Sequence, residues 1–101
     1  MDVSEELRKV ESSGEIILGS KQSIDATENG ESRLTILSTT CPREVEKKIR
    51  ELAKKNEVPL YFYPKGSEDL GLALGKPFLV STVAVIDSGD SRVLELGEVP
   101  K

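Results

Sequence analysis

A lysine in the segment "IILGSKQS" (16–23) stands where a strand pattern gives way to a helical one. Lys21 therefore falls in the first turn of a predicted helix, where the helix dipole disfavours a cation by roughly a few tenths of a kcal/mol. The free N–H groups of a helix start bind anions such as phosphate, and Gly19 lets a ligand approach the backbone closely. The segment predicts an anion contact that uses both the lysine and the backbone.

Two glycine–lysine segments invite comparison with the phosphate loop of nucleotidases, which needs G-x-x-x-x-G-K-[ST]. In "GEIILGSK" (14–21) the four intervening residues are themselves a strand, and Ser20 displaces the lysine by one position. In "GLALGKP" (71–77) one residue is missing, and Pro77 stands where a metal-binding hydroxyl belongs. Neither segment supports a nucleotidase.

Covalent and acid–base catalysis lack the necessary partners. Cys41 is the one cysteine, and the chain has no histidine to activate it. Glu68 and Asp69 fall in a predicted first helical turn, where the dipole explains them. A single cysteine excludes an intrachain disulfide and a Cys-rich zinc site. We expect no enzyme, no cofactor and no metal.

Two further loops carry residues that suit an RNA base. "STTCP" (38–42) offers small hydroxyls after a strand, and "GKPFLVS" (75–81) places apolar residues after a turn. The plainer interpretation of the second loop is entry into a buried strand. Loops of successive α/β units gather at one end of a sheet, however. An apolar loop beside a glycine–lysine helix start would suit an unstacked base and its flanking phosphates.

Apolar spacing and turn residues predict the element order α-β-α-β-α-β-α-β-β. Helices are expected over 3–12, 20–29, 42–56 and 67–74, and strands over 15–18, 33–38, 58–63, 79–87 and 92–96. The expected N-caps are Ser4, Ser20 and Ser67. Pro59 limits its strand to a sheet edge or a strand start. This alternation predicts an α/β fold, a three-layer α/β/α sandwich with a mixed sheet of four to five strands. Residues 1–101 should form one domain, with "GEVPK" loose at its end.

Composition limits the class of protein. Hydrophobic residues make up 37% and aromatic residues 4%, so the core must be aliphatic. No apolar run approaches the ~20 residues of a membrane helix, the charged start "MDVSEELRKVESSGE" is no signal peptide, and the cysteine count favours a reducing cytosol. The net charge of −4 and the pI of about 4.9 argue against non-specific nucleic-acid binding. A small positive site remains compatible with them, because salt screens charges beyond about 8 Å.

The segments "ILGSKQSI" (17–24), "LGLALGKPFLVS" (70–81) and "DSGDSRVLEL" (87–96) resemble the archaeal and eukaryotic ribosomal protein L thirty-e family. That family belongs to a kink-turn-binding superfamily that includes the L seven-Ae proteins. The resemblance covers essentially the whole chain, and its second half is the more specific. It implies an α/β/α sandwich that binds a kinked internal loop of large-subunit ribosomal RNA.

The resemblance implies three RNA-binding stretches. They comprise Gly19, Ser20, Lys21, Gln22 and Ser23; then Thr40; then Lys76, Phe78, Leu79, Val80 and Ser81. Lys21 would oppose the helix dipole because the lysine and the N–H groups of the helix start both face RNA. Phe78, Leu79 and Val80 would pack on a flipped-out base, and Ser81 follows where a small residue is expected. Thr40 stands where the family usually has asparagine, so it keeps a hydroxyl but loses the bidentate reach of an amide.

The resemblance implies a structural component of the large ribosomal subunit in the cytoplasm. Its partners would be ribosomal RNA and other ribosomal components, without a membrane, and it would be a monomer outside the ribosome. One alternative is a kink-turn binder of another ribonucleoprotein, although the Lys21–Gln22 pair favours the ribosomal branch. Another is an acidic protein-interaction domain that has lost RNA, which the net charge and Thr40 favour. A salt-rich cytosol is one hypothesis for the low pI.

Overall fold

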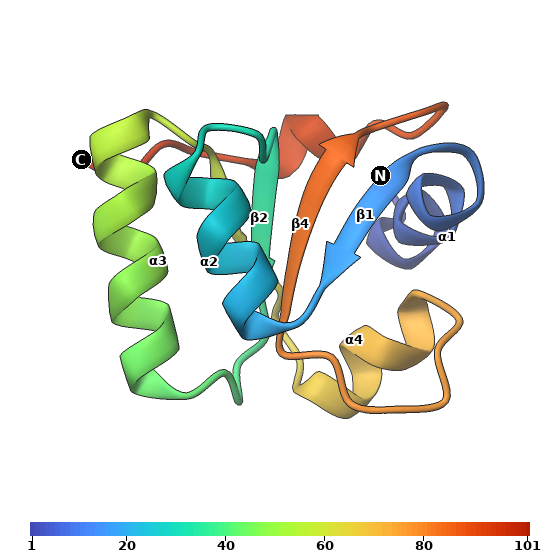
Figure 1. The fold of residues 1–101 in the computed structure, drawn as a ribbon. Coiled ribbons are helices and arrows are strands. Elements are labelled where there is room, and N and C mark those ends of the chain that lie inside the picture. The colour runs from blue at the N-terminus through green and yellow to red at the C-terminus, as the bar shows by residue number, and fades with distance from the viewer.

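The computed structural model describes residues 1–101 and contains four α-helices, four strands and one 3-10 helix (Figure 1). The helices are α1 (Val3–Ser13), α2 (Ser20–Glu28), α3 (Arg43–Asn56) and α4 (Ser67–Ala73). The strands are β1 (Glu15–Leu18), β2 (Leu34–Leu37), β3 (Leu60–Phe62) and β4 (Thr82–Asp87), and the 3-10 helix η1 spans Val93–Leu96. The first eight predicted elements are confirmed in type and order. None of the helices has the length and hydropathy needed to cross a membrane.

The four strands form one mixed sheet in the order β1-β4-β2-β3. β4 runs antiparallel to both β1 and β2, whereas β3 runs parallel to β2. β3 lies at the sheet edge and begins directly after Pro59, as the proline predicts. The α/β class and the mixed sheet are therefore confirmed, with four strands rather than five.

The fifth predicted strand, over 92–96, is wrong, because this segment forms η1. Both edges of β4 are already occupied by β1 and β2, so a returning hairpin strand has no edge of β4 to pair with. Val93 is instead buried in the core. The chain rejoins the sheet at Glu98, whose N–H and C=O bond Leu60 of β3 at 3.0 and 2.9 Å. The segment expected to be loose is therefore tied to the outer edge of the sheet.

Three helix starts differ by a residue or two from the prediction. Asp2, not Ser4, caps α1, since its carboxylate accepts the N–H of Glu5 at 3.2 Å. Gly19 precedes α2 with φ of 104°, a backbone conformation that glycine adopts most easily. Gly66 precedes α4. Ser20 and Ser67 are therefore the first helical residues, and their hydroxyls are free to bond other segments.

Strand alternation divides the aliphatic core between the two faces of the sheet. Helices α1 and α4 and η1 cover one cluster, which comprises Leu7, Val10, Leu34, Ile36, Tyr63, Leu70, Leu74, Val80, Val83, Val85 and Val93. Helices α2 and α3 cover the other, which comprises Leu37, Cys41, Ile49, Ala53, Val58 and Leu60. Figure 1 shows α2 and α3 on one side of the sheet and α1 and α4 on the other. Helices therefore cover both faces.

The strand directions decide where the loops lie. The carboxyl ends of β1, β2 and β3 meet the amino end of β4 at one end of the sheet, the lower end in Figure 1. The connections that leave β1, β2 and β3 and the connection that enters β4 are gathered there. We call this region the converging-loop end.

Candidate nucleic-acid interface

Backbone hydrogen bonds hold together the segments that carry the three predicted stretches at the converging-loop end. The N–H of Gly19 donates to the carbonyl of Thr82 at 3.2 Å, and the N–H of Ser38 donates to the carbonyl of Ser81 at 2.9 Å. The starts of α2 and β4 and the end of β2 are thereby held together. A cavity of about 320 Å³ opens between the first and third stretches, lined by Leu18, Gly19, Ser20, Phe78, Leu79, Val80 and Ser81.

The start of α2 presents unneutralised positive charge. No side chain caps this helix and no acidic residue lies in its first turn. Its first N–H groups therefore have no intrahelical acceptor. Lys21 is exposed and takes part in none of the five ion pairs of the protein. This combination of a helix start and a free lysine favours an anionic ligand.

The remaining residues of the first stretch differ in accessibility. Gln22 is exposed beside Lys21, and Ser20 is half-buried with its hydroxyl 3.5 Å from that of Thr82. Ser23, by contrast, is fully buried, and its Oγ has no hydrogen-bond partner. One helical turn after Gly19 the chain faces the sheet, so the side chain of Ser23 cannot contact a ligand at the surface.

Thr40 and Ser67 form the centre of a hydroxyl cluster that sequence reasoning missed. The Oγ1 of Thr40 accepts the N–H of Ser67 at 2.9 Å, so Thr40 caps the start of α4 from a different loop. The Oγ of Ser67 lies 2.8 Å from the hydroxyl oxygens of Ser38, Thr40 and Ser81. Three segments of the chain are thereby linked: the loop after β2, the start of α4 and the approach to β4. Ser67 was expected only as a cap of its own helix, and no local pattern points to the cluster.

The apolar loop before β4 splits into exposed and buried residues. Phe78 is 55% exposed and Leu79 is 70% exposed. Both line a groove with a third exposed apolar side chain, Leu72 of α4. Val80 is 3% exposed and belongs to the core cluster under α1 and α4, where its side chain packs with those of Val83 and Val85. The plainer interpretation, entry into a buried strand, is therefore right for the side chain of Val80. The expected base contact can therefore use only the side chains of Phe78 and Leu79.

Gly71 of α4 allows the loop that carries Phe78 to lie close to the helix. A Cβ at Gly71 of α4 would lie 2.2 Å from the carbonyl oxygen of Phe78. The absence of a side chain therefore lets the loop pack directly on the helix backbone. The N–H of Val80 also donates to the carbonyl of Ser67 at 3.1 Å, and this bond holds the end of the loop on α4.

Ionisable groups near the interface are partly neutralised. Lys76 forms an ion pair with Glu11 of α1 at 3.2 Å, so its charge is less available than that of Lys21. Glu68 and Asp69 line a second cavity of about 470 Å³ together with Thr40. Of the two candidate lysines, Lys21 therefore has the more available charge.

Cys41 lies between Thr40 and the start of α3, and its side chain faces the core. It is buried in the α3 cluster, and burial raises the pKa of its thiol. A thiol with a raised pKa stays protonated at neutral pH and is a poor nucleophile. This agrees with the interpretation of Cys41 as a small residue at a helix start.

Comparisons with known proteins identify the family and agree with the fold. The model of the "Ribosomal protein L7Ae/L30e/S12e/Gadd45 family" matches residues 1–95. A Methanocaldococcus jannaschii protein named large ribosomal subunit protein eL30 is 37% identical over 98 residues, covering 97% of this chain and 89% of that relative. A Methanothrix thermoacetophila protein of the same name is 38% identical over 96 residues, covering 95% and 89%.

A solved structure from Bacillus halodurans C, titled as a protein with unknown function, has a TM-score of 0.80. It is 26% identical and covers 93% of both chains. The shared architecture thus extends beyond relatives with ribosomal names. Since the family model spans nearly the whole sequence and several relatives exceed 30% identity, this chain belongs to the ribosomal protein L7Ae/L30e/S12e/Gadd45 family.

Proposed function

We propose that the protein is a structural, non-enzymatic component of the large ribosomal subunit that binds a kink-turn of ribosomal RNA. The ribosomal names of its relatives support the first half of this proposal. One observation carries the second half: at the uncapped start of α2, Gly19 and Ser20 line a cavity together with Phe78 and Leu79, and the exposed Lys21 is the next residue of the helix. A cationic helix start beside an apolar ridge suits a phosphate next to an unstacked base.

In this proposal the phosphate contact resolves the position of Lys21. In the free protein its charge is repelled by the dipole of α2. When a phosphate binds, the N–H groups and the ammonium face the same anion, and both interactions become favourable. Gly19 contributes by leaving the backbone open, since a Cβ there would meet nothing within 4 Å but would be strained at φ of 104°.

The base would pack on Phe78 and Leu79, with Leu72 extending the apolar surface. Stacking of a base on an aromatic ring contributes about 1–3 kcal/mol. Gln22 and Thr40 supply hydrogen-bonding groups at the rim. Because the Oγ1 of Thr40 already accepts the N–H of Ser67, less of its capacity remains for a base edge than an amide would offer.

The hydroxyl cluster would hold these groups in place before the RNA arrives. Ser67 links the loops that carry Thr40 and Ser81. Loops that are already ordered lose less conformational entropy on binding, which raises affinity. The protein would act as a single domain, monomeric outside the cytoplasmic ribosome, with ribosomal RNA and neighbouring ribosomal components as its partners.

The test is a titration against a kink-turn RNA and a fully paired RNA of the same length, at several salt concentrations. We expect much tighter binding of the kinked RNA. Lys21→Ala and Phe78→Ala should each weaken it by about 1–3 kcal/mol. Arg33→Ala is the control, since Arg33 is exposed just before β2, at the other end of the sheet.

Equal affinity for the two RNAs would overturn the proposal and favour an acidic protein-interaction domain. A second measurement separates the ribosome from other ribonucleoproteins. A tagged copy expressed in its host should sediment with large ribosomal subunits in a sucrose gradient. Sedimentation with a smaller RNA particle would leave kink-turn binding intact and reassign the assembly.

A further inference from the structure

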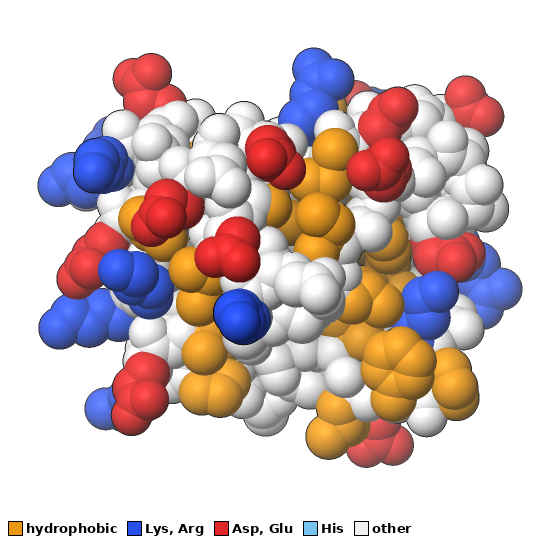
Figure 2. Space-filling view, in the orientation of Figure 1, with side chains coloured by type: hydrophobic (Ala, Val, Ile, Leu, Met, Phe, Trp, Pro, Cys, Tyr) orange, Lys and Arg blue, Asp and Glu red, His pale blue; other side chains and the backbone are white.

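Helix α3 carries a charge opposite to that of the rest of the protein. It holds six of the 14 basic residues and three of the 18 acidic ones, a net charge of +3. Since the whole chain carries a net charge of −4, the residues outside α3 carry −7. Figure 2 shows Lys and Arg side chains gathered along the left margin, over α3, with acidic ones between them. An acidic protein has concentrated its positive charge on one helix.

The basic residues of α3 are ordered by helical spacing. Arg43, Lys47, Arg50 and Lys54 follow one another at intervals of four, three and four residues, so they share one side of the helix. All four are exposed, and only Arg50 is paired, with Glu46 at 3.3 Å. We call them the α3 stripe. The neighbouring row alternates in sign, as Glu44, Lys48, Glu51 and Lys55.

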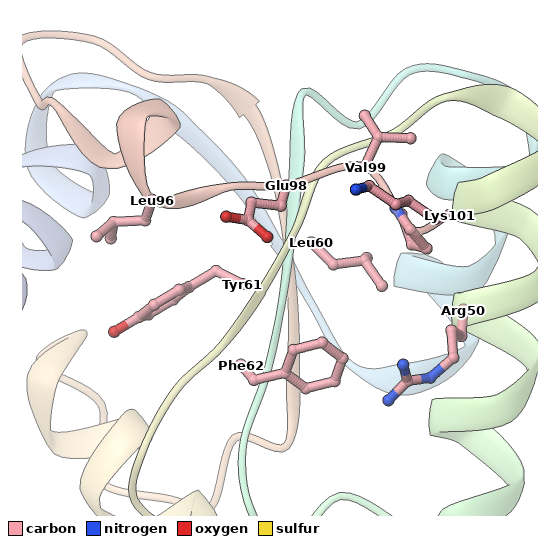
Figure 3. Close-up of a pocket in the computed structure, with 9 residues that line it drawn as sticks. Arg50, Leu60, Tyr61, Phe62, Leu96, Glu98, Val99 and Lys101 are labelled. Carbon is pink, nitrogen blue, oxygen red and sulfur yellow. The ribbon is translucent and has the colours of Figure 1, made fainter.

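The α3 stripe borders a groove at the outer edge of β3. This groove is about 560 Å³ in volume and is lined by Arg50, Leu60, Tyr61, Phe62, Leu96, Glu98, Val99, Pro100 and Lys101. The guanidinium carbon of Arg50 lies 4.9 Å from the centroid of the Phe62 ring, which is 44% exposed. Figure 3 shows Arg50 reaching from α3 toward this ring. An exposed ring beside a guanidinium offers a stacking surface for a nucleic-acid base.

The α3 stripe starts at the converging-loop end. Thr40 of the proposed interface is followed closely by Arg43, the first residue of α3. From there the helix rises about 1.5 Å per residue, so the stripe runs roughly 16 Å away from the interface. An RNA held at the interface has its flanking strands nearby, at high effective concentration. The remaining, strongly acidic surface would repel these strands, whereas the α3 stripe would attract them.

We propose that the α3 stripe, with the Arg50–Phe62 pair beside it, is a second RNA contact. It follows the sugar–phosphate backbone of the RNA arm that leaves the kinked loop. This inference rests on the proposed function and adds a division of labour to it. The converging-loop end recognises the kinked loop by shape and stacking, and the α3 stripe adds affinity that is independent of sequence and sensitive to salt.

Helix α3 supplies a matched pair of variants for the test. The stripe variant is Lys47→Gln with Lys54→Gln, and the control is Lys48→Gln with Lys55→Gln on the neighbouring row. Both remove two charges seven residues apart from exposed positions of the same helix. Each would be titrated against two kink-turn RNAs with the same kinked loop, one with minimal arms and one with arms extended by a helical turn. Circular dichroism would verify that both variants fold.

We expect the stripe variant to bind the long-armed RNA about tenfold more weakly than wild type, and its salt slope to fall by about two. Its affinity for the short-armed RNA should change less than twofold, and the control should behave like wild type with both. Equal losses in both variants would indicate a general charge effect and overturn the inference. So would wild-type affinity of the stripe variant for the long-armed RNA, while the proposed function would stand. Failure of wild type to bind the short-armed kinked RNA would overturn both.

Discussion

The converging-loop end and helix α3 represent two ways to build a binding surface. At the loop end, hydroxyls from separate segments meet on Ser67 and hold Thr40 and Ser81 in fixed positions. Lys21 is exposed at this end and forms no ion pair. Helix α3 instead presents a row of cations by periodicity, and apart from the contact of Arg50 with Phe62 this row lies opposite the buried face of Ile49, Leu52 and Ala53. A surface that recognises shape needs long-range contacts to position it, whereas a surface that attracts charge needs only a stable helix.

The largest effect is expected from a substitution at Gly71, which should change the converging-loop end and leave helix α3 as it is. Gly71→Ala would place a Cβ 2.2 Å from the carbonyl oxygen of Phe78. Overpacking of this kind typically destabilises a protein by about 1–3 kcal/mol. It should also displace the apolar loop and weaken binding of kinked RNA, while the salt dependence due to α3 stays unchanged. Urea unfolding and RNA titration measure the two effects.

The control for this prediction is Gly30→Ala. Gly30 has φ of 71°, but a Cβ there would meet nothing within 4 Å. Alanine should therefore destabilise the protein by about 1 kcal/mol through backbone strain and leave RNA affinity unchanged. If Gly71→Ala binds kinked RNA as well as Gly30→Ala does, the loop position does not govern recognition.

A smaller effect is expected from the hydroxyl cluster. Ser67→Ala removes the bonds of its hydroxyl with those of Ser38, Thr40 and Ser81. Partners left without a hydrogen bond should lower the free energy of unfolding by about 1–2 kcal/mol. Thermal unfolding would measure this loss. Ser4→Ala is the control, because Ser4 is exposed on α1 and should change stability by less than about 0.5 kcal/mol.

Thr40→Asn tests whether threonine at this position limits the hydrogen bonds that the converging-loop end can make to a base edge. An asparagine Oδ1 can accept the N–H of Ser67 as Thr40 does, and its amide N–H groups remain for a base edge. We expect a gain in kinked-RNA affinity of about 1 kcal/mol, roughly fivefold. Thr39→Asn, at the exposed preceding position, should give no gain. An unchanged or lower affinity of Thr40→Asn would mean that the base is read elsewhere.

The smallest effect on RNA binding is expected from Glu6, which lies outside both surfaces. Its buried carboxylate accepts the N–H of Arg92 at 2.6 Å and pairs with Lys9 at 3.1 Å. The hydrogen bond from Arg92 lowers the pKa of Glu6 from its ordinary value of 4.5, and Lys9 lowers it further. A carboxyl whose pKa is lowered by folding stabilises the folded state above its unfolded pKa. It loses that contribution as the pH falls below 4.5 and through the folded-state pKa.

Glu6→Gln should therefore reduce the difference in melting temperature between pH 7 and pH 3, without changing RNA affinity at pH 7. Melting curves at several pH values measure this. Glu5→Gln, on an exposed neighbour, should leave the pH dependence as in wild type. An identical pH profile for Glu6→Gln and wild type would show that this buried carboxylate does not contribute to acid sensitivity.

Much of the fold follows from short stretches of sequence. The period of Val45, Ile49 and Leu52 predicts α3 within one residue of its observed bounds. Pro59 predicts an edge or start for β3, and both are found. The helical pattern from Ser20 predicts Lys21 in a first turn, and α2 places it there. The roles of the candidate site residues in RNA binding stay predictions.

The local sequence determined what depends on near neighbours: backbone propensity, apolar period and the position of a lysine relative to a helix start. The tertiary structure decided the rest. It turned Val80 inward and left Leu79 outside, and it made Ser67 the centre of a cluster. It also excluded a fifth strand, because β1 and β2 already occupy both edges of β4. These outcomes depend on contacts between residues far apart in the chain, and such contacts leave no mark in a short window of sequence.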